Sequence, residues 1–252
     1  MPRILVTNDD GVEAPGLRAL ADALAPLGEV TVVAPAEESS AVSHALTLRR
    51  PLCLTRISES WYSVDGTPTD CVNLGITDVL EQAPDLVVSG INNGLNVGED
   101  VTYSGTVAGA LEGVLLGAPG LAVSLQRGGD PMNYEPAAGI AGRLAEAVLV
   151  NGLPPHTLLN VNVPRAAHRG IRATVQGRRT QAIAAMQAVR DAVRSMVWIG
   201  AAKLRWEQEP ASDYAAIQAG WVSVTPLQTD WTNHAALADT EALARATLAD
   251  VE

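Results

Sequence analysis

Two adjacent carboxylates near the start of the chain are the residues whose types and spacing point most directly to chemistry. Asp9 and Asp10 follow the apolar run Ile4–Val6. Three apolar residues in a row indicate a strand buried on both faces, as in a parallel sheet, and Asn8-Asp9-Asp10-Gly11 has the composition of a turn. Like charges this close repel unless a cation lies between them, and Mg²⁺ prefers oxygen ligands. The pair predicts a cation site after the first strand, although a solvated turn that caps the next helix is the simpler interpretation of this segment alone.

A second predicted strand, Val30–Val33, ends in a loop that carries serines and a histidine. An amphipathic helix over 15–27 separates it from the first strand, so the two strands form a βαβ unit and pair in parallel. The loop then emerges at the same sheet edge as the carboxylates. Ser40 offers a hydroxyl, which can fill one position around Mg²⁺. His44 fits either a structural histidine, the simpler interpretation, or a contact to substrate.

A third predicted strand, Leu86–Gly90, leads into a loop rich in asparagine and glycine. Asn92 and Asn96 lie in this loop. An asparagine side chain offers a carbonyl oxygen to a cation and an NH₂ group to a phosphate oxygen. The loop therefore adds candidate ligands at the same edge, while an ordinary Asn-Gly turn remains the alternative.

A glycine-rich helix is predicted to begin at Ser104-Gly105-Thr106. Free backbone N–H groups and the helix dipole make such a start attractive to an anion, and a plain Ser/Thr N-cap explains the segment about equally well. Gly109, Gly113 and Gly117 recur every four residues and share one face. Each interior glycine weakens a helix by roughly 0.5–1 kcal/mol relative to alanine, so the stripe predicts close packing on a neighbouring element.

The alternation of strands and helices defines the expected fold. Further strands are predicted over 121–125 and 158–163, with a helix around 136–150. The pattern predicts an α/β fold with a Rossmann-like three-layer core and a mainly parallel sheet. Short strands over 46–64 suggest antiparallel strands or a hairpin outside that sheet.

The C-terminal third is predicted to be a β-rich excursion. Strands are expected at 171–175, 196–199 and 221–226, followed by a helix over roughly 235–249. We expect a single domain over 1–252, with 1–165 as the core and about 170–252 as a β-hairpin arm plus a C-terminal helix.

Composition and charge exclude some classes of function. Lys+Arg 17 against Asp+Glu 28 gives a net charge of −11, so the field of the molecule repels nucleic acid. Cys53 and Cys71 lack metal-ligand spacing and are too few for a disulfide framework. No basic-then-apolar leader precedes Ile4, and glycine and proline interrupt every apolar run. We therefore expect a cytoplasmic protein that binds neither nucleic acid nor membrane.

With these loops in place, the sequence resembles the SurE family (survival protein E), metal-dependent phosphatases that act on nucleoside monophosphates. The similarity runs through most of the chain in order, in Asn8-Asp9-Asp10-Gly11, Val33-Ala34-Pro35 with Ser40, Gly66-Thr67-Pro68-Thr69-Asp70-Cys71-Val72, Ser89-Gly90-Ile91-Asn92, Tyr103-Ser104-Gly105-Thr106, Leu159–Pro164, Gly220–Leu227 and Asp230–His234.

The resemblance implies particular ligands and an assembly. It implies one divalent cation per subunit, Mg²⁺ or Mn²⁺, on Asp9, Asp10, Ser40 and Asn92, with phosphate bound near Asn96 and Ser104-Gly105-Thr106. It also implies a homodimer or homotetramer built by exchange of C-terminal segments.

Two segments depart from the family pattern. The loop before the metal serine is usually basic or amide-bearing, whereas here it reads Ala36-Glu37-Glu38-Ser39. The excursion reads Arg190-Asp191-Ala192-Val193-Arg194 where the family pattern has a proline-and-glycine turn. These departures bear on substrate preference and on the arm, and leave the predicted metal ligands intact.

The sequence as a whole predicts a 5'-nucleotidase, with Asn8, Asp9 and Asp10 as catalytic residues. A cation at this site would polarise the phosphoryl group and lower the pKa of a bound water. Two alternatives stay open at this point. One is attack by an aspartate to give an aspartyl-phosphate, and the other is a nucleotide-binding module without catalysis.

Overall fold

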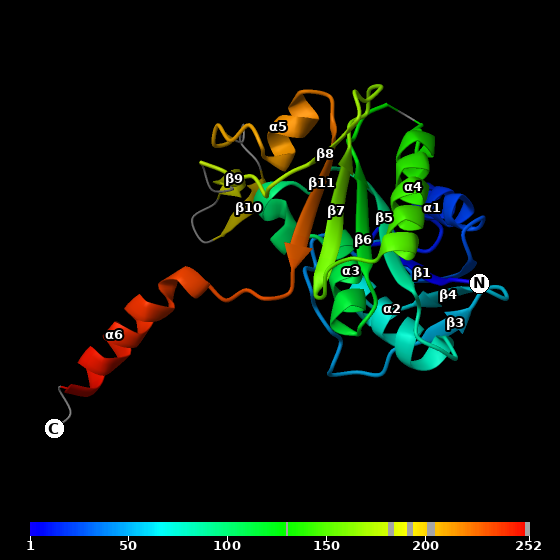
Figure 1. The fold of residues 1–252 in the computed structure, drawn as a ribbon, viewed down its shortest axis with the longest axis horizontal. Coiled ribbons are helices and arrows are strands. Elements are labelled where there is room, and N and C mark those ends of the chain that lie inside the picture. The colour runs from blue at the N-terminus through cyan, green and yellow to red at the C-terminus, as the bar shows by residue number, and fades with distance from the viewer. Residues whose placement is uncertain (130, 181–183, 191–193, 201–204, 250–252) are drawn as a thin grey trace.

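A nine-stranded sheet runs through the centre of the molecule (Figure 1). The structure is a computed structural model that describes residues 1–129, 131–180, 184–190, 194–200 and 205–249. In spatial order the strands are β3 (Leu54–Arg56), β4 (Trp61–Val64), β2 (Glu29–Pro35), β1 (Arg3–Thr7), β5 (Leu86–Asn93), β6 (Gly120–Leu125), β7 (Thr157–Val163), β11 (Val222–Gln228) and β8 (Ile171–Ala173). The pairs β3–β4 and β11–β7 are antiparallel, and the other pairs in this sheet are parallel.

Helices cover both faces of this sheet and complete three layers. On one face α1 (Pro15–Leu24) packs against α4 (Glu135–Asn151), and the largest apolar core lies between them and the strands. On the other face α2 (Pro68–Leu74) packs against α3 (Gly105–Leu115) over two smaller cores. The predicted α/β fold with a mainly parallel sheet is confirmed.

Shorter elements complete the chain. They are the π-helical turn η1 (Gly75–Val79), the 3₁₀ turns η2 (Gly98–Thr102) and η3 (His234–Ala236), and the helices α5 (Asp213–Gln218) and α6 (Leu237–Ala249). Among the described residues, no helix has both the length and the apolar character needed to cross a membrane.

The glycine stripe of α3 lets this helix approach the sheet closely. A Cβ on Gly109 would lie 2.8 Å from Thr7 Cγ2, and one on Gly113 would lie 2.6 Å from Val87 Cβ. The predicted packing is therefore confirmed at these two positions. It is wrong at Gly117, which lies beyond the end of the helix with φ +95° and nothing within 4 Å of an added Cβ. Gly117 supplies a left-handed backbone conformation instead.

The strands predicted over 46–64 belong to the main sheet and not to a separate hairpin. β3 and β4 are antiparallel as expected, but β4 also pairs in parallel with β2, which places both at the sheet edge. Leu46–Leu48 forms no strand. The sequence pattern identified the pairing of β3 with β4 and gave no signal for the longer-range pairing with β2.

The three strands predicted for the C-terminal excursion are confirmed as β8, β10 (Ser195–Gly200) and β11, and β9 (Ala184–Arg190) is a further strand that was not predicted. β8 and β11 extend the main sheet beyond β7. A separate two-stranded sheet is formed by β9 and β10. The atypical turn between them falls largely on residues 191–193, which lie outside the described residues.

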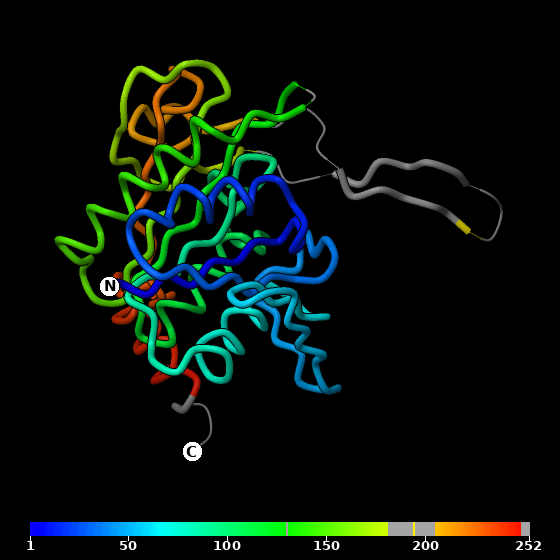
Figure 2. The backbone as a smooth tube through the Cα atoms, turned by 90° about the vertical axis from the view of Figure 1, so that its right-hand side faces the viewer, coloured from blue at the N-terminus to red at the C-terminus, as the bar shows by residue number. Residues whose placement is uncertain are grey.

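The loop after β2 and helix α5 lie at opposite ends of the body (Figure 2). Figure 2 shows the light-blue residues after β2 at one end of the body and the orange residues of α5 at the other. The red helix α6 projects away from the body (Figure 1). Because β1, β2, β5 and β6 are parallel neighbours, the loops that follow them meet at one edge.

Candidate metal and phosphate site

The loop after β1 is buried and positions three polar side chains. Asn8 is fully buried, and its Nδ2 donates to the Gly11 carbonyl oxygen at 2.9 Å. Its Oδ1 is also buried, without a hydrogen-bond partner. A buried acceptor without a partner is costly, so this atom is available to a water, a ligand or a cation.

Asp9 is held against the start of α3. Its side chain is only 4% exposed, and Oδ1 accepts a hydrogen bond of 2.6 Å from Thr106 Oγ1. A Cβ on Gly105 would lie 2.9 Å from Asp9 Cβ and 3.1 Å from Oδ2, so only glycine lets the helix approach so closely. Burial raises the pKa of Asp9 to about 6; the Thr106 hydrogen bond opposes this shift and the Asp10 charge adds to it.

Asp10 is less buried and lies between charges of opposite sign. Its Oδ2 accepts from the Asn93 backbone N–H at 3.3 Å. Burial raises the pKa of Asp10, the Asn93 hydrogen bond lowers it, and Glu38 raises it while Arg127 lowers it. The two carboxylates thus share one loop but have different surroundings.

Ser40 reaches this edge on the loop after β2. The Ser39 backbone N–H donates to the Asp9 carbonyl oxygen at 2.8 Å, which ties the two loops together. Ser40 itself is exposed, and its Oγ donates to Glu38 Oε1 at 2.7 Å. Its oxygen lone pairs remain free to accept.

Asn92 lies at the end of β5, beside the backbone group that bonds Asp10. Its Nδ2 donates to the Gly94 carbonyl oxygen at 2.9 Å, which fixes the orientation of the amide. The amide oxygen Oδ1 can then accept a hydrogen bond or bind a cation. The neighbouring Asn93 Oδ1 is buried without a partner.

The donor set at this edge suits a hard divalent cation. Within the described residues there is no cluster of three or more His, Cys, Asp and Glu side chains arranged for a metal, and the predicted set needs none because it consists of two carboxylates and two neutral oxygens. Oxygen ligands of this kind are those that Mg²⁺ and Mn²⁺ prefer. The unpartnered Asn8 Oδ1 and the raised pKa of Asp9 both fit a site in which a positive charge is expected.

The predicted phosphate residues begin α3 as expected, but two of them already have partners. Ser104 is the N-cap, and its Oγ accepts from the Val107 N–H at 3.1 Å. The Thr106 hydroxyl is committed to Asp9. Backbone N–H groups of the first turn, including that of Gly105, thus lie beside the carboxylate and are the groups left for an anion.

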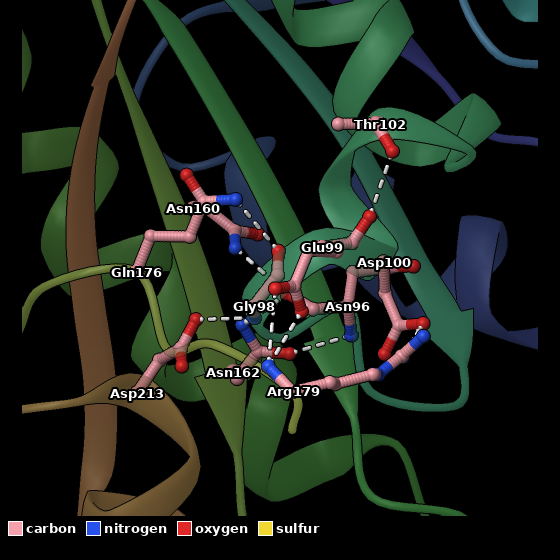
Figure 3. Close-up of polar contacts among 10 residues, drawn as sticks. All are labelled: Asn96, Gly98, Glu99, Asp100, Thr102, Asn160, Asn162, Gln176, Arg179 and Asp213. Atoms are coloured by element: carbon pink, nitrogen blue, oxygen red, sulfur yellow. Dashed lines mark hydrogen bonds and ion pairs between the residues drawn. The ribbon is translucent and has the colours of Figure 1, made fainter. Parts of the chain in front are cut away.

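Asn96 lies within a buried amide network (Figure 3). Its backbone N–H donates to Asn162 Oδ1 at 2.8 Å, and its Nδ2 donates to Ser124 Oγ at 2.9 Å. Its carbonyl oxygen accepts from the Nδ2 groups of Asn160 and Asn162. Asn96 therefore anchors its loop to β6 through its side chain and to β7 through its backbone, and one N–H of its side-chain amide is left for a ligand.

The same loop is fixed on its other side by residues of the C-terminal part (Figure 3). The fully buried Asp213 accepts from the Gly98 N–H at 2.8 Å, and Gln176 Nε2 donates to the Gly98 carbonyl oxygen at 3.0 Å. Arg179 forms an ion pair with Asp100. These contacts set the entry into α3.

His44 pairs with a buried carboxylate on α3. Its Nε2 lies 2.8 Å from Glu112 Oε2, and Asn73 Nδ2 donates to Glu112 Oε1 at 2.9 Å. These partners hold the pKa of Glu112 below its usual range in spite of its burial. Glu112 is nearly two turns beyond Thr106 along α3, so this pairing fits the structural interpretation of His44, and the contact to substrate stays a prediction.

Sequence reasoning missed Glu38 and Arg127 as residues that bear on this site, and it predicted Thr106 as a phosphate contact without its bond to Asp9. Thr106 bonds Asp9, Glu38 bonds Ser40, and Arg127 donates from Nε and Nη2 to the Asn93 carbonyl oxygen at 3.1 and 2.9 Å. Arg127 follows β6, so the rule that ligands gather at the carboxyl ends of parallel strands would have found it.

Comparison with known proteins identifies the family. The family model for survival protein SurE matches residues 4–183. The chain belongs to the SurE family. It is 51% identical over 239 residues to the 5'-nucleotidase SurE of Geotalea daltonii, covering 94% of this chain and 96% of the relative. The 5'-nucleotidase SurE of Geobacter sulfurreducens is 51% identical over 237 residues, covering 93% and 90%.

A solved structure supports the fold of this SurE chain. The crystal structure of the SurE protein from Aquifex aeolicus matches with a TM-score of 0.87 at 43% sequence identity, covering 96% of this chain and 100% of the other. The family resemblance expected from the sequence motifs is therefore confirmed over nearly the whole chain.

Proposed function

We propose that this SurE chain is a 5'-nucleotidase that hydrolyses nucleoside monophosphates to nucleoside and inorganic phosphate. The observation that carries the proposal is the pair of adjacent carboxylates at the sheet edge, buried Asp9 and half-buried Asp10, near the loops of Ser40 and Asn92 and the start of α3. Relatives that are about half identical over nearly the full length are named 5'-nucleotidase SurE.

In this proposal Asp9, Asp10, Ser40 and Asn92 hold one Mg²⁺ or Mn²⁺. Such an ion, when bound, polarises a phosphoryl oxygen and lowers the pKa of a coordinated water. Thr106 fixes the rotamer of Asp9, and the Asn93 N–H fixes Asp10. Both carboxylates are therefore positioned before a ligand arrives.

The remaining residues bind and orient the phosphate. Backbone N–H groups of the first turn of α3, at Ser104-Gly105-Thr106, face charge that builds on the phosphoryl oxygens. Asn96, on the loop after β5, is held in place by Asn162 and Ser124. The unpartnered Asn8 Oδ1 would accept a hydrogen bond from a water and so orient it toward phosphorus.

Metal removal tests the proposal. Activity on a nucleoside monophosphate should disappear in EDTA and return with Mn²⁺ or Mg²⁺, because the four proposed ligands are all oxygens. Full activity in chelator after dialysis would contradict the metal site. Nucleotide binding without any phosphate release would instead favour a non-catalytic module.

An aspartyl-phosphate intermediate is the alternative mechanism. Asp9 Oδ1 is committed to Thr106, which favours a role as ligand over a role as nucleophile. Acid quench and mass spectrometry during turnover would detect a phosphorylated Asp9 or Asp10. An adduct that forms and decays at the rate of turnover would replace the attack by water.

We also propose that the protein is a cytoplasmic homodimer or homotetramer joined through its C-terminal segment. An apolar groove of about 640 Å³ opens between α3 and the end of β11, lined in part by Val107, Leu111 and Leu227, and next to it Trp231 is 78% exposed. Such a surface fits burial in an assembly. Both cysteines are free, as expected in a reducing compartment.

Truncation tests the assembly. Removal of the chain after Leu227 should reduce the oligomer, as measured by light scattering with full-length protein at the same concentration. An unchanged oligomer would place the contact elsewhere.

A further inference from the structure

The loop that carries Ser40 contains an acidic residue that no step of the proposed mechanism uses. Glu38 Oε1 accepts a hydrogen bond from the Ser40 hydroxyl, with 2.7 Å between the two oxygens. A hydroxyl that donates to a carboxylate directs its lone pairs away from that carboxylate and becomes a stronger ligand. The hydrogen bond therefore bears directly on how well Ser40 binds a cation.

The position of this loop brings Glu38 close to the carboxylate pair. The Ser39 N–H donates to the Asp9 carbonyl oxygen at 2.8 Å. A Cβ on Gly11 would lie 3.4 Å from Glu37 C and 3.5 Å from Glu38 N, so the loop packs on the turn that follows Asp10. The charge of Glu38 is felt at Asp10, where it acts as a repulsive neighbour.

We propose that Glu38 is a positioning residue for the cation: it orients the Ser40 hydroxyl and adds a third negative charge beside Asp9 and Asp10. The inference rests on the metal site of the proposed function. It also explains how the acidic sequence Glu37-Glu38 is compatible with this edge of the sheet, because a bound divalent cation offsets the repulsion between Glu38 and Asp10.

Two features separate the role of Glu38 from a general effect of charge. Glu37 carries the same charge one residue earlier. Its contact in this loop is made by its backbone carbonyl oxygen, which accepts a hydrogen bond from Ser39 Oγ. Glu37→Ala is therefore a matched control for charge. Glu38→Gln retains an oxygen that accepts from Ser40 and removes only the charge.

The experiment measures Mn²⁺ affinity of the full-length apoprotein by calorimetry, without substrate. Loss of an outer ligand partner typically costs about 10- to 100-fold in metal affinity. We expect Glu38→Ala to weaken Mn²⁺ binding about 10-fold, Glu38→Gln to weaken it less, and Glu37→Ala to change it less than about 2-fold. Circular dichroism and melting temperature should be unchanged, since Glu38 is exposed.

A double-mutant cycle with Ser40→Ala provides the decisive comparison. If Glu38 acts through the Ser40 hydroxyl, Glu38→Ala should have a clearly smaller effect on Mn²⁺ affinity in the Ser40→Ala background. Equal losses in both backgrounds, or a loss no larger than that of Glu37→Ala, would overturn the inference and leave the proposed function standing. Absence of Mn²⁺ binding by the wild-type protein would overturn both.

Discussion

The two loops that meet at the candidate site differ in how firmly the fold holds them. The loop after β1 is buried, and Asp9 is fixed by Thr106 and by the glycine face of α3. The loop after β2 is largely exposed, and Ser40 is oriented mainly by its neighbour Glu38. The two carboxylates proposed as ligands thus lie on the more rigid loop, whereas the serine proposed as a neutral ligand lies on an exposed loop.

This difference suggests a division of labour between the loops. A rigid pair of carboxylates defines where a cation binds, because their position costs little reorganisation when the ion arrives. An exposed hydroxyl can be replaced by a water, since Mg²⁺ readily keeps waters. Four predictions test this contrast, beginning with the largest expected effect.

Removal of charge from the rigid loop should have the largest effect. Asp9→Asn and Asp10→Asn keep the shape of the side chain but remove a full charge next to the cation, where Coulomb attraction is strong. Removal of a residue that only hydrogen-bonds a metal ligand typically costs about 10- to 100-fold in metal affinity or activity. We expect each of these two variants to lose more turnover than that at any practical metal concentration. Initial rates on a nucleoside monophosphate across a Mn²⁺ titration provide the measurement, with Glu37→Gln as the control. Rates within a few-fold of wild type for both variants would place the metal elsewhere.

The packing of α3 behind the rigid loop gives the second prediction. Gly109→Leu should lower the free energy of unfolding by at least the roughly 1–3 kcal/mol typical of overpacking, because a Cβ there already lies 2.8 Å from Thr7 Cγ2 and 2.9 Å from Ser89 Oγ. Gly139→Leu in α4 is the matched control, since nothing lies within 4 Å of its added Cβ. Equal melting temperatures for the two variants would show that the stripe is not closely packed.

The third prediction concerns the cost of burying Asp9 without a metal. Burial raises the pKa of Asp9 from 3.8 to about 6, so between these values the folded state binds more protons than the unfolded state. The contribution of Asp9 to the stability of the apoprotein is therefore lost as pH rises through this window, by up to about 3 kcal/mol.

Denaturant unfolding in EDTA at pH 4 and pH 7 measures this cost. Asp9→Asn should be more stable than wild type at pH 7 and lose that advantage at pH 4, although it is inactive at both. An advantage of the same size at both values would mean that ionisation of Asp9 is not its source.

The smallest effects are expected at the neutral ligands. Ser40→Ala and Asn92→Ala should retain a fraction of activity that rises with added Mn²⁺, because water can take the vacant position. Ser39→Ala is the control for the loop, since its Oγ donates only long hydrogen bonds of 3.5 Å, to the carbonyl oxygens of Glu37 and Gly66. Complete loss that added Mn²⁺ does not relieve would show that the serine loop is as essential as the carboxylate pair.

The sequence was sufficient to predict the sheet edge but not the contacts within it. Short apolar runs and the loops after them located Asp9, Ser40 and Asn92, because strand ends leave a strong local signal. The bond between Thr106 and Asp9 joins residues 97 positions apart. No periodicity reports such a contact, and Thr106 was instead predicted to bind phosphate directly.

One other error and one unforeseen contact have the same origin. β4 was predicted outside the sheet because its pairing with β2 is long-range. His44 pairs with the carboxylate of Glu112, which lies 68 residues further along the chain. Local patterns therefore predicted which elements form, and tertiary contacts decided which polar groups remain free.

Helix α6 has one further consequence, for measurements by hydrogen exchange. It projects from the body (Figure 1), and the side chains described along it are all exposed. Helices of about 12–15 residues are marginal in water without tertiary packing, and α6 has 13. In dilute monomer its amide protons should exchange almost as fast as those of a free peptide, while those of β1 remain protected. Covering α6 with a second copy would slow that exchange. The deuteration rate of this helix, measured across protein concentrations, would therefore report the fraction of the protein that is assembled.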